Sequence, residues 1–497
     1  MRHASIAGRL QSTSMMSGPP LCFRFGLEAG NAAFDFETTD SNLTLPRGHG
    51  LNPLRLLVVS YTFPPYAKVG SIRIAQFCHY LPEFGIEPIV LSVEERFYES
   101  LDHSRPIPPS FRLLRTQKLA NPIEWLANAK KHLISSAHAA KTKPGPPTTA
   151  TEKGWLRTNL LALSQVPDRD WGWYLPASRR AEEFLRAEHV DAVFSSGPPY
   201  TAHLVARHLK KKFGIPWLAD FRDPWAKAKQ VQPKPGWWHQ LTARFERSCI
   251  HTADVVLCNT SRLCDSFRAQ YPRLNPAKFQ TLTNGFEDLP APATRTNGSR
   301  RLLLHLGSIY GHRRIDTFLS ALAGLVHSGQ IDGDSLRVIF HGDIDSRRLS
   351  EAVRTAPDLI ERKCVQFLPR IPWDQAWSLL WQSDLLLLFQ GGHELQVPAK
   401  FYEYLQTGIP MFAVTEEGAL TDSLQATDSG IWVRPDDPQI IAEGLLRALK
   451  LPKQSAEDVA RRLSGQYHYR ALTKQLSAWI REITTHPAAN KERASSH

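Results

Sequence analysis

A lysine and a glutamate three positions apart, Lys400 and Glu403, carry groups that could bind a phosphorylated ligand. They follow the apolar run 384–389 and a turn at Gly391 and Gly392, and a second apolar run comes after them. This order predicts a strand, a loop, a helix that carries the pair, and another strand. Because parallel α/β sheets bind ligands at the carboxyl ends of their strands, the pair suits a nucleoside diphosphate, with Lys400 at the phosphates and Glu403 at the ribose. A weak surface pair on a helix is the alternative.

A candidate acid–base cluster follows another apolar run, 215–219. Asp220, Arg222 and Asp223 come directly after this run, at the predicted carboxyl end of a buried strand. One carboxylate could act as a base while the arginine keeps it ionised. The alternative is an internal ion pair that fixes the loop.

Two loops with candidate anion-binding groups follow the apolar runs 54–60 and 301–307. In the first loop, Gly70 allows the backbone to approach a ligand, and Ser71 can cap a helix predicted over 72–84. In the second loop, adjacent arginines lead into a helix, and guanidinium groups match the geometry of phosphate oxygens. Both loops are therefore candidates for binding a phosphorylated ligand or another substrate.

The elements that must position these groups alternate along the chain. Apolar runs typical of buried strands are separated by stretches with helical periodicity in both halves. Strand–helix–strand alternation predicts parallel sheets with right-handed crossovers. A stretch rich in Pro, Gly, Ser and Thr at 290–299 separates the halves and predicts a linker. The sequence therefore predicts an α/β fold with a parallel sheet in each half.

Composition sets the broad class. A chain of 497 residues suggests two or three domains, and 42% hydrophobic with 22% charged residues is typical of a globular protein with a sizeable core. No apolar run is long enough to span a membrane. The six cysteines show neither CxxC pairs nor the spacing of metal fingers. We therefore expect a reduced, cytoplasmic protein without structural zinc.

The net charge of +12 calls for an anionic partner, and nucleic acid, an anionic membrane surface or phosphorylated substrates would all fit. Six lysines and arginines stand against one glutamate in the segment 128–157. The overlapping stretch 121–140 alternates apolar and basic residues, which predicts an amphipathic helix on a membrane surface. A solvated insertion is the alternative, since the segment continues into the Pro-rich stretch 143–147.

Several common signatures are missing. Neither GxGxxG nor GxxxxGK[ST] occurs, which argues against Rossmann dehydrogenases and P-loop nucleotide hydrolases. Residues 1–50 show little periodicity and lack the apolar core of a secretory signal. We expect them to form a disordered extension, which could lie upstream of the natural start.

Five stretches carry a more specific signal. They are Ser-Tyr-Thr-Phe-Pro-Pro at 60–65, Ser-Ser-Gly-Pro-Pro at 195–199, Asp-Phe-Arg-Asp-Pro-Trp at 220–225, Gly-Ser-Ile-Tyr-Gly-His-Arg at 307–313 and Glu-Tyr-Leu at 403–405. Together they resemble the family-4-like glycosyltransferases of GT-B architecture, also called glycosyl transferase group 1. The resemblance covers roughly residues 54–483.

The resemblance implies two Rossmann-like domains whose parallel sheets face a central cleft. The amino-terminal domain would bind the acceptor and the carboxyl-terminal domain the nucleotide sugar. Glu403 is then expected at the donor ribose, and Arg313 and Lys400 at the diphosphate, with Gly70 across the cleft from it. The last helix of the chain is expected to return to the first domain.

One position departs from the family pattern. The family usually carries a second glutamate eight positions before Glu403, and this chain has Leu395 there. Glu394 stands beside that position. The contact with a sugar hydroxyl is therefore expected from Glu394, from Gln396, or from backbone amides around the turn Gly391–Gly392.

The function that the resemblance implies is retaining transfer of a sugar from a nucleoside-diphosphate donor to a glycan or lipid-linked saccharide, in the synthesis of surface polysaccharide or glycoconjugates. Asp220, Arg222 and Asp223 are then expected to act in catalysis or acceptor binding. Positive side chains and helix-end amides can stabilise the leaving diphosphate, so neither a metal nor a cofactor is expected. The expected partners are the nucleotide sugar, the acceptor and an anionic membrane surface at the cytoplasmic face.

The domain boundaries follow from these patterns. We expect the acceptor domain over 51–289 with the basic insertion at 128–157, and the donor domain over 300–466. A crossing helix and a tail would occupy 467–497.

Two other classes of function also fit parts of the sequence. A nucleotide-sugar epimerase shares the fold and the donor site but needs no acceptor. A nucleic-acid-binding protein would explain the charge, but no RNA- or DNA-reading motif accompanies it. We therefore expect no nucleic-acid partner.

Overall fold

The computed structural model describes residues 53–67, 69–103, 111–120, 159, 162–227, 234–287 and 300–485. The predicted extension 1–50, the amphipathic stretch 121–140, the basic segment 128–157 and the linker 290–299 lie outside the described residues. Our interpretations of these segments therefore remain predictions.

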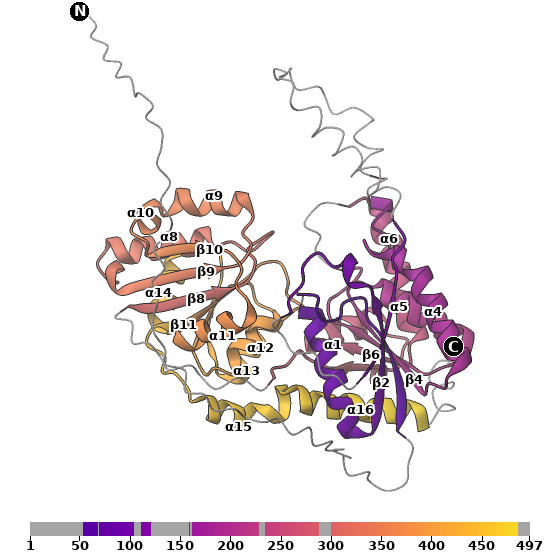
Figure 1. Ribbon diagram of the computed structural model, residues 1–497. Coiled ribbons are helices and arrows are strands. Elements are labelled where there is room, and N and C mark those ends of the chain that lie inside the picture. The colour runs from indigo at the N-terminus through magenta and orange to yellow at the C-terminus, as the bar shows by residue number, and fades with distance from the viewer. Residues whose placement is uncertain are drawn as a thin grey trace, which may run out of the picture. The chain divides into compact units, whose positions relative to one another are not determined.

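The described residues of the amino-terminal half form a sheet of seven parallel strands in the order β3-β2-β1-β4-β5-β6-β7, with helices on its faces (Figure 1). The strands are β1 (Leu54–Val59), β2 (Ile86–Val93), β3 (Arg112–Thr116), β4 (Ala192–Gly197), β5 (Trp217–Phe221), β6 (Val255–Cys258) and β7 (Phe279–Thr281). The helices are α1 (Val69–Tyr80), α4 (Tyr174–Ala187), α5 (Thr201–Phe213), α6 (Gly236–Thr252) and α7 (Ser261–Gln270). Short 3₁₀ turns are η1 (Leu81–Phe84), η2 (Glu95–Phe97), η3 (Trp171–Trp173) and η4 (Pro276–Lys278).

Strand β1 shows why these strands read as continuous apolar runs. Leu57 and Val59 lie in the hydrophobic core on one face of the sheet, while Leu56 and Val58 lie in the core on the other face. A strand with both faces buried has no polar side to alternate with its apolar side. The continuous run 54–60 was therefore a reliable prediction of a central strand.

The described residues of the carboxyl-terminal half form a second parallel sheet, with six strands in the order β10-β9-β8-β11-β12-β13. Its strands are β8 (Arg301–Leu306), β9 (Leu336–His341), β10 (Val365–Leu368), β11 (Leu385–Gln390), β12 (Met411–Thr415) and β13 (Gly430–Val433). Its helices are α8 (Asp316–His327), α9 (Ser346–Thr355), α10 (Pro357–Glu361), α11 (Trp373–Gln382), α12 (Ala399–Leu405), α13 (Ala419–Thr427) and α14 (Pro438–Ala448), with the 3₁₀ turn η5 (Gly333–Ser335).

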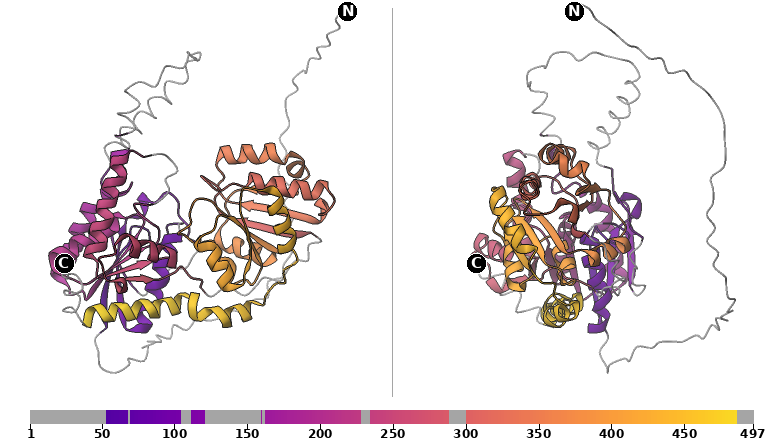
Figure 2. Two further views of the ribbon diagram at one scale, coloured as in Figure 1. Left: turned by 180° about the vertical axis from the view of Figure 1, so that it is seen from behind. Right: turned by 90° about the vertical axis from the view of Figure 1, so that its left-hand side faces the viewer.

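The last two helices, α15 (Ala456–Tyr467) and α16 (Tyr469–Thr485), belong to different cores and appear in yellow in Figures 1 and 2. Leu463 of α15 is buried in the core of the second sheet, whereas Leu476 and Ile480 of α16 are buried in the core of the first. The Tyr469 ring meets the Phe77 ring of α1 edge to face, with 5.7 Å between centroids. The expected return of the last helix to the first domain is confirmed.

The α/β fold with two Rossmann-like parallel sheets is thus confirmed. One boundary was wrong. The helix predicted over 72–84 begins earlier, at Val69, and η1 replaces its last turn. Ser71 therefore lies inside the first turn of α1 and does not cap it. Its hydroxyl is buried and has no hydrogen-bond partner among the described residues.

In the part of the chain that the structure describes, none of the helices combines the length and the apolar character that crossing a bilayer requires.

Candidate active site

The strand order places the candidate loops at the switch point of each sheet. Chain order reverses between β1 and β4 in the first sheet and between β8 and β11 in the second. Open α/β sheets bind ligands at this point, outside the carboxyl ends of the strands. The loop with Arg313 follows β8 and the loop with Gly391 follows β11, so both lie at the switch point of the second sheet.

The loop after β8 folds back on itself around Arg313. The Arg313 Nη1 donates to the Ser308 carbonyl at 2.6 Å, and its guanidinium carbon lies 4.5 Å from the centroid of the Tyr310 ring. The Arg313 Nε is buried and has no hydrogen-bond partner among the described residues. A buried, unpaired cationic donor is costly unless an acceptor reaches it, and an anionic ligand would supply one.

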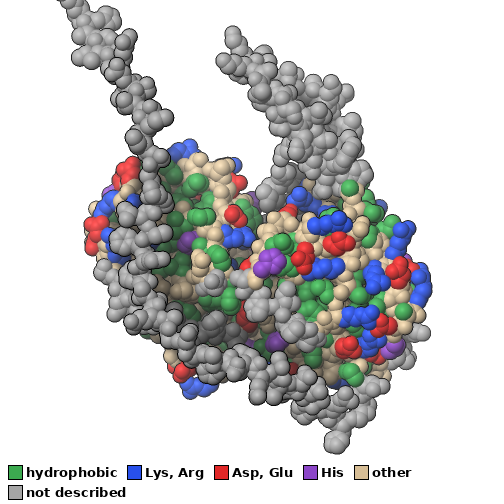
Figure 3. All heavy atoms as spheres, in the orientation of Figure 1, with side chains coloured by type: hydrophobic (Ala, Val, Ile, Leu, Met, Phe, Trp, Pro, Cys, Tyr) green, Lys and Arg blue, Asp and Glu red, His purple; other side chains and the backbone are tan. Residues whose placement is uncertain are grey.

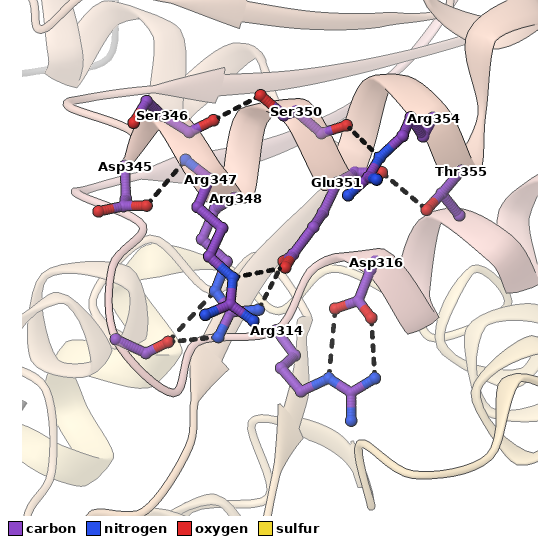
Figure 4. A network of polar contacts seen from close by, with 11 residues as sticks. Arg314, Asp316, Asp345, Ser346, Arg347, Arg348, Ser350, Glu351, Arg354 and Thr355 are labelled. Atoms are coloured by element: carbon purple, nitrogen blue, oxygen red, sulfur yellow. Dashed lines mark hydrogen bonds and ion pairs between the residues drawn. The ribbon is translucent and has the colours of Figure 1, made fainter. Parts of the chain in front are cut away.

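The neighbouring Arg314 behaves differently. Its Nη2 and Nε donate to the two carboxylate oxygens of Asp316 at 2.8 and 3.3 Å (Figure 4). This fork-shaped pair holds the guanidinium at the start of α8. Of the two adjacent arginines, Arg313 is therefore the one with a buried donor that lacks a partner among the described residues.

The loop after β11 is built against the first loop. A methyl group at Gly391 would lie 2.1 Å from the carbonyl oxygen of His312, so only glycine allows this approach. The buried amide of Gln390 donates to the carbonyls of His393 and Gln396 at 2.7 and 2.8 Å. The two loops of the switch point are consequently one connected unit.

Lys400 and Glu403 lie on α12, which begins at Ala399. The Lys400 Nζ donates to a Glu403 carboxylate oxygen at 2.8 Å, and the side chains are 33% and 17% exposed. Lys400 and Glu403 therefore form the ion pair between neighbouring turns of a helix that was the alternative interpretation of this motif. Glu403 also lines a small pocket, together with Ile72, Trp377 and Tyr469.

A buried histidine that the sequence interpretation passed over lies close to both cations. The His305 Nδ1 is 2.8 Å from the Leu387 carbonyl, which can only accept, so Nδ1 carries the proton and Nε2 is left as a buried acceptor. Burial lowers the pKa of His305 to about 4, and the charges of Arg313 and Lys400 act in the same direction.

At the first sheet, the three members of the predicted acid–base cluster have different hydrogen-bond partners. Asp220 is fully buried, and its carboxylate oxygens accept from the Arg73 Nη2 and Nε at 2.8 and 3.1 Å. The Ser196 hydroxyl donates to the same carboxylate at 2.7 Å. Asp220 thus forms an internal ion pair, the alternative interpretation, and its partner is Arg73 rather than Arg222. The interpretation of Asp220 as a base stays a prediction.

The Arg222 side chain lies at the switch point of the first sheet, and its position accounts for the glycine at position 70. Its guanidinium lies directly against Gly70, where a methyl group would overlap it. Its backbone N–H donates to the Gly197 carbonyl at 3.0 Å, and its Nη2 donates to the Pro198 carbonyl. Burial lowers the pKa of Arg222, and Asp223 and Asp220 oppose that shift. In this structure Gly70 makes room for a protein side chain.

Asp223 is the member of the cluster that meets the second sheet. The Gln396 amide donates to its carboxylate at 2.6 Å. Burial raises the pKa of Asp223, and the charge of Arg222 and the Gln396 hydrogen bond lower it in part. A partly buried carboxyl with a raised pKa is a typical candidate for acid–base chemistry or for binding a hydroxyl.

The position that departs from the family pattern also lies at this contact. Leu395 packs against the hydrophobic core of the first sheet, and its carbonyl accepts from the Thr260 hydroxyl at 2.7 Å. The neighbouring Glu394 is exposed to solvent. Leu395 therefore contributes an apolar contact where the family pattern has a carboxylate.

The geometry groups the candidate residues into two sets. Arg313, Lys400, Glu403 and the turn Gly391–Gly392 lie around the switch point of the second sheet, with Glu394 on the loop that follows the turn. Gly70, Arg222 and Asp223 lie at the first sheet. Arg73 was missed, although a lone charge among apolar neighbours in a predicted helix signals a buried partner.

Two parallel sheets of this topology, each with candidate ligand-binding loops at its switch point, are typical of GT-B proteins. A family model described as Glycosyltransferase Family 4 matches residues 144–288, and one described as Glycosyl transferases group 1 matches residues 300–450. Together the matches cover more than half of the chain. The chain belongs to the family-4-like glycosyltransferases of GT-B architecture.

Solved structures agree with this fold. Sucrose-phosphate synthase from Thermosynechococcus elongatus aligns with a TM-score of 0.57 at 14% identity, covering 87% of this chain and 99% of that chain. WaaG, a glycosyltransferase involved in lipopolysaccharide biosynthesis, aligns with a TM-score of 0.53 at 16% identity over 86% and 99%. HepE from Anabaena in complex with UDP aligns with a TM-score of 0.52 at 13% identity over 86% and 100%. No curated protein gives a significant match.

Proposed function

We propose that this glycosyltransferase moves a sugar from a nucleoside-diphosphate donor to a glycan or lipid-linked saccharide, with retention of anomeric configuration, in the synthesis of surface polysaccharide or glycoconjugates. The observation that carries the proposal is the close contact of Gly391 with His312, which joins the two loops of the donor-side switch point beside the unpaired Arg313 Nε. The UDP bound to HepE and the role of WaaG in lipopolysaccharide biosynthesis support the choice of donor and acceptor class.

Four of the candidate residues have a role in the proposed reaction. Negative charge grows on the diphosphate as the glycosidic bond breaks, and Arg313 and Lys400 would stabilise it. Glu403 would accept hydrogen bonds from the ribose, which requires its contact with Lys400 to rearrange. Asp223 would bind or deprotonate the acceptor hydroxyl. We propose that these groups act without a metal ion, so activity should survive treatment with EDTA.

The test is a thermal-shift screen against a panel of UDP-, GDP-, ADP- and TDP-sugars, followed by transfer of radiolabel from the stabilising sugar to glycan and lipid-linked acceptors. Labelled product with the anomeric configuration of the donor would support the proposal. Donor epimerisation without transfer would support the epimerase alternative, which the family matches disfavour.

We further propose that the protein binds an anionic membrane face reversibly. The support is the sequence of segment 128–157, because each basic residue near such a surface contributes about 1 kcal/mol. On the face seen in Figure 3, the Lys and Arg side chains of the described residues are interspersed with Asp and Glu and form no large basic patch. Salt-sensitive co-sedimentation with anionic but not neutral vesicles is expected, and deletion of 128–153 should abolish it while donor affinity survives. Equal binding to both kinds of vesicle would contradict this.

Replacing Glu403 with alanine should weaken binding of the donor nucleotide about 10- to 100-fold. Loss of a hydrogen bond to a charged acceptor costs about 1.5–3 kcal/mol, which corresponds to this range. Isothermal titration with the nucleotide selected in the screen measures the change. The matched control is Glu443→Ala, which removes an exposed glutamate of α14 in the same domain. Wild-type affinity in Glu403→Ala would refute the ribose assignment.

Replacing Gln396 with alanine should move the acid limb of the kcat/KM profile to higher pH. The Gln396 hydrogen bond lowers the pKa of Asp223, and its loss leaves burial and the Asp220 charge to raise that pKa against Arg222 alone. Because Asp223 must be ionised to accept a proton, activity would then be lost at a higher pH as the solution is acidified. The control is Gln425→Ala, which removes an exposed glutamine of α13 in the same domain. An unshifted limb would show that Asp223 does not titrate in the reaction.

A further inference from the structure

The turn that carries Arg313 is held from outside by a side chain of another helix. Gly311 lies at the bend of this turn with a left-handed φ of +60°. Its carbonyl accepts from the Arg348 Nη2 at 2.5 Å and from the Nε at 3.2 Å (Figure 4). Two donors from one planar guanidinium fix both the position and the direction of the carbonyl.

Arg348 is itself fixed. Its Nη1 donates to a Glu351 carboxylate oxygen at 2.8 Å, and the Arg347 Nε donates to the other oxygen at 2.9 Å. These hydrogen bonds lower the pKa of the Glu351 carboxyl. The Arg348 side chain is 16% exposed, whereas that of Arg347 is 82% exposed. The ion pair on Arg348 is thus sheltered, and its guanidinium has little rotational freedom.

The backbone joins the same two segments. The Ile309 N–H donates to the Asp343 carbonyl at 2.9 Å, and the Asp345 N–H donates to the Ile309 carbonyl at 3.0 Å. Asp345 then caps α9 by accepting from the Arg347 N–H at 2.9 Å. These bonds fix the start of the turn, and Arg348 fixes its bend.

We propose that Arg348 is a positioning residue for glycosyl transfer, which orients the turn at Gly311 so that Arg313 meets the donor diphosphate. The inference rests on the proposed function, in which Arg313 binds that diphosphate. Arg348 touches neither donor nor acceptor in this scheme. Without Arg348, the bend at Gly311 can adopt the many backbone conformations open to glycine. The backbone of Arg313 would then no longer be held in one position.

Replacing Arg348 with methionine, which keeps an unbranched apolar stem, should lower kcat about tenfold, since displacements near 1 Å in a catalytic group cost up to about 100-fold. KM for the donor should change less than kcat. Arg348→Lys should recover part of the rate, because lysine can still donate to the Gly311 carbonyl. The control is Arg354→Met on the same helix, whose guanidinium reaches only the Ser350 carbonyl among the residues that the structure describes.

A double-mutant cycle separates positioning from general stabilisation. If Arg348 acts through Arg313, then Arg348→Met should cost little further turnover in an Arg313→Ala background. Multiplicative losses in the double variant would overturn the proposal, as would unchanged kcat in folded Arg348→Met. Wild-type turnover in Arg313→Ala would defeat the assignment of Arg313 as well. A loss in Arg313→Ala with no loss in Arg348→Met would defeat only the positioning role.

Discussion

Replacing Arg313 with alanine is expected to lower kcat for glycosyl transfer by about 10²- to 10³-fold, with a smaller change in the KM for the donor. Charge on the diphosphate grows towards the transition state, so a preorganised cation contributes more there than in the ground state. The unpaired, buried Arg313 Nε is a donor of this kind. Lys400→Ala should lower kcat in the same direction. Initial rates over a range of donor concentrations separate kcat from KM.

The adjacent arginine provides a matched control. Arg314 carries the same charge, but Asp316 already accepts from two of its nitrogens, and its side chain is 46% exposed. We therefore expect Arg314→Ala to keep turnover close to that of the wild type. If Arg313→Ala and Lys400→Ala both turned over at the wild-type rate, the groups that stabilise the diphosphate must lie elsewhere.

The fold could be predicted because its central strands are buried on both faces. In β11, Leu385 and Leu387 lie in one core and Leu386 and Leu388 in the other. Such strands appear in the sequence as unbroken apolar runs, and the loops after them were located by the turn residues that end each run. The donor-side candidates were found in this way, since they follow β8 and β11.

The start of α1 could not be predicted from local sequence. Gly70 favours a turn when its neighbours alone are considered, and Ser71 is a common helix cap. In the structure, Gly70 lies inside the helix, and the Arg222 guanidinium occupies the space that a side chain at this position would fill. This contact joins residues far apart in the chain, so local sequence could not indicate it.

The ion-pair partners within the first-sheet cluster could not be predicted for a related reason. Asp220 and Arg222 are neighbours in sequence, but the partner of Asp220 is Arg73, 147 residues earlier. The pattern of residue types showed that charges gather at this strand end. It could not show which of them neutralise one another, because that depends on how α1 crosses the sheet. Likewise, the sequence showed that Leu395 departs from the family pattern, but it could not show that Leu395 packs against the first sheet.

Replacing Arg73 with methionine should destabilise the amino-terminal domain by about 3–5 kcal/mol. Arg73 and Asp220 are both fully buried, and removing one partner of a buried pair leaves an uncompensated charge. Arg73 also donates to the Leu282 carbonyl at 2.8 Å and to the Thr283 carbonyl at 2.5 Å, so two backbone acceptors would lose their donor. Urea unfolding followed by tryptophan fluorescence measures the change in the free energy of unfolding.

Two comparisons identify the cause of the loss. Arg470 forms an exposed pair with Glu83, with side chains 65% and 41% exposed, so Arg470→Met should change the free energy of unfolding much less than Arg73→Met. Adding Asp220→Asn to Arg73→Met removes the unpaired charge and should recover part of the stability. If Arg73→Met alone were as stable as the wild type, the buried pair would contribute nothing to holding α1 on the first sheet. Because α1 begins beside Arg222 at the switch point of the first sheet, a loss of stability there should also lower activity before the second domain unfolds.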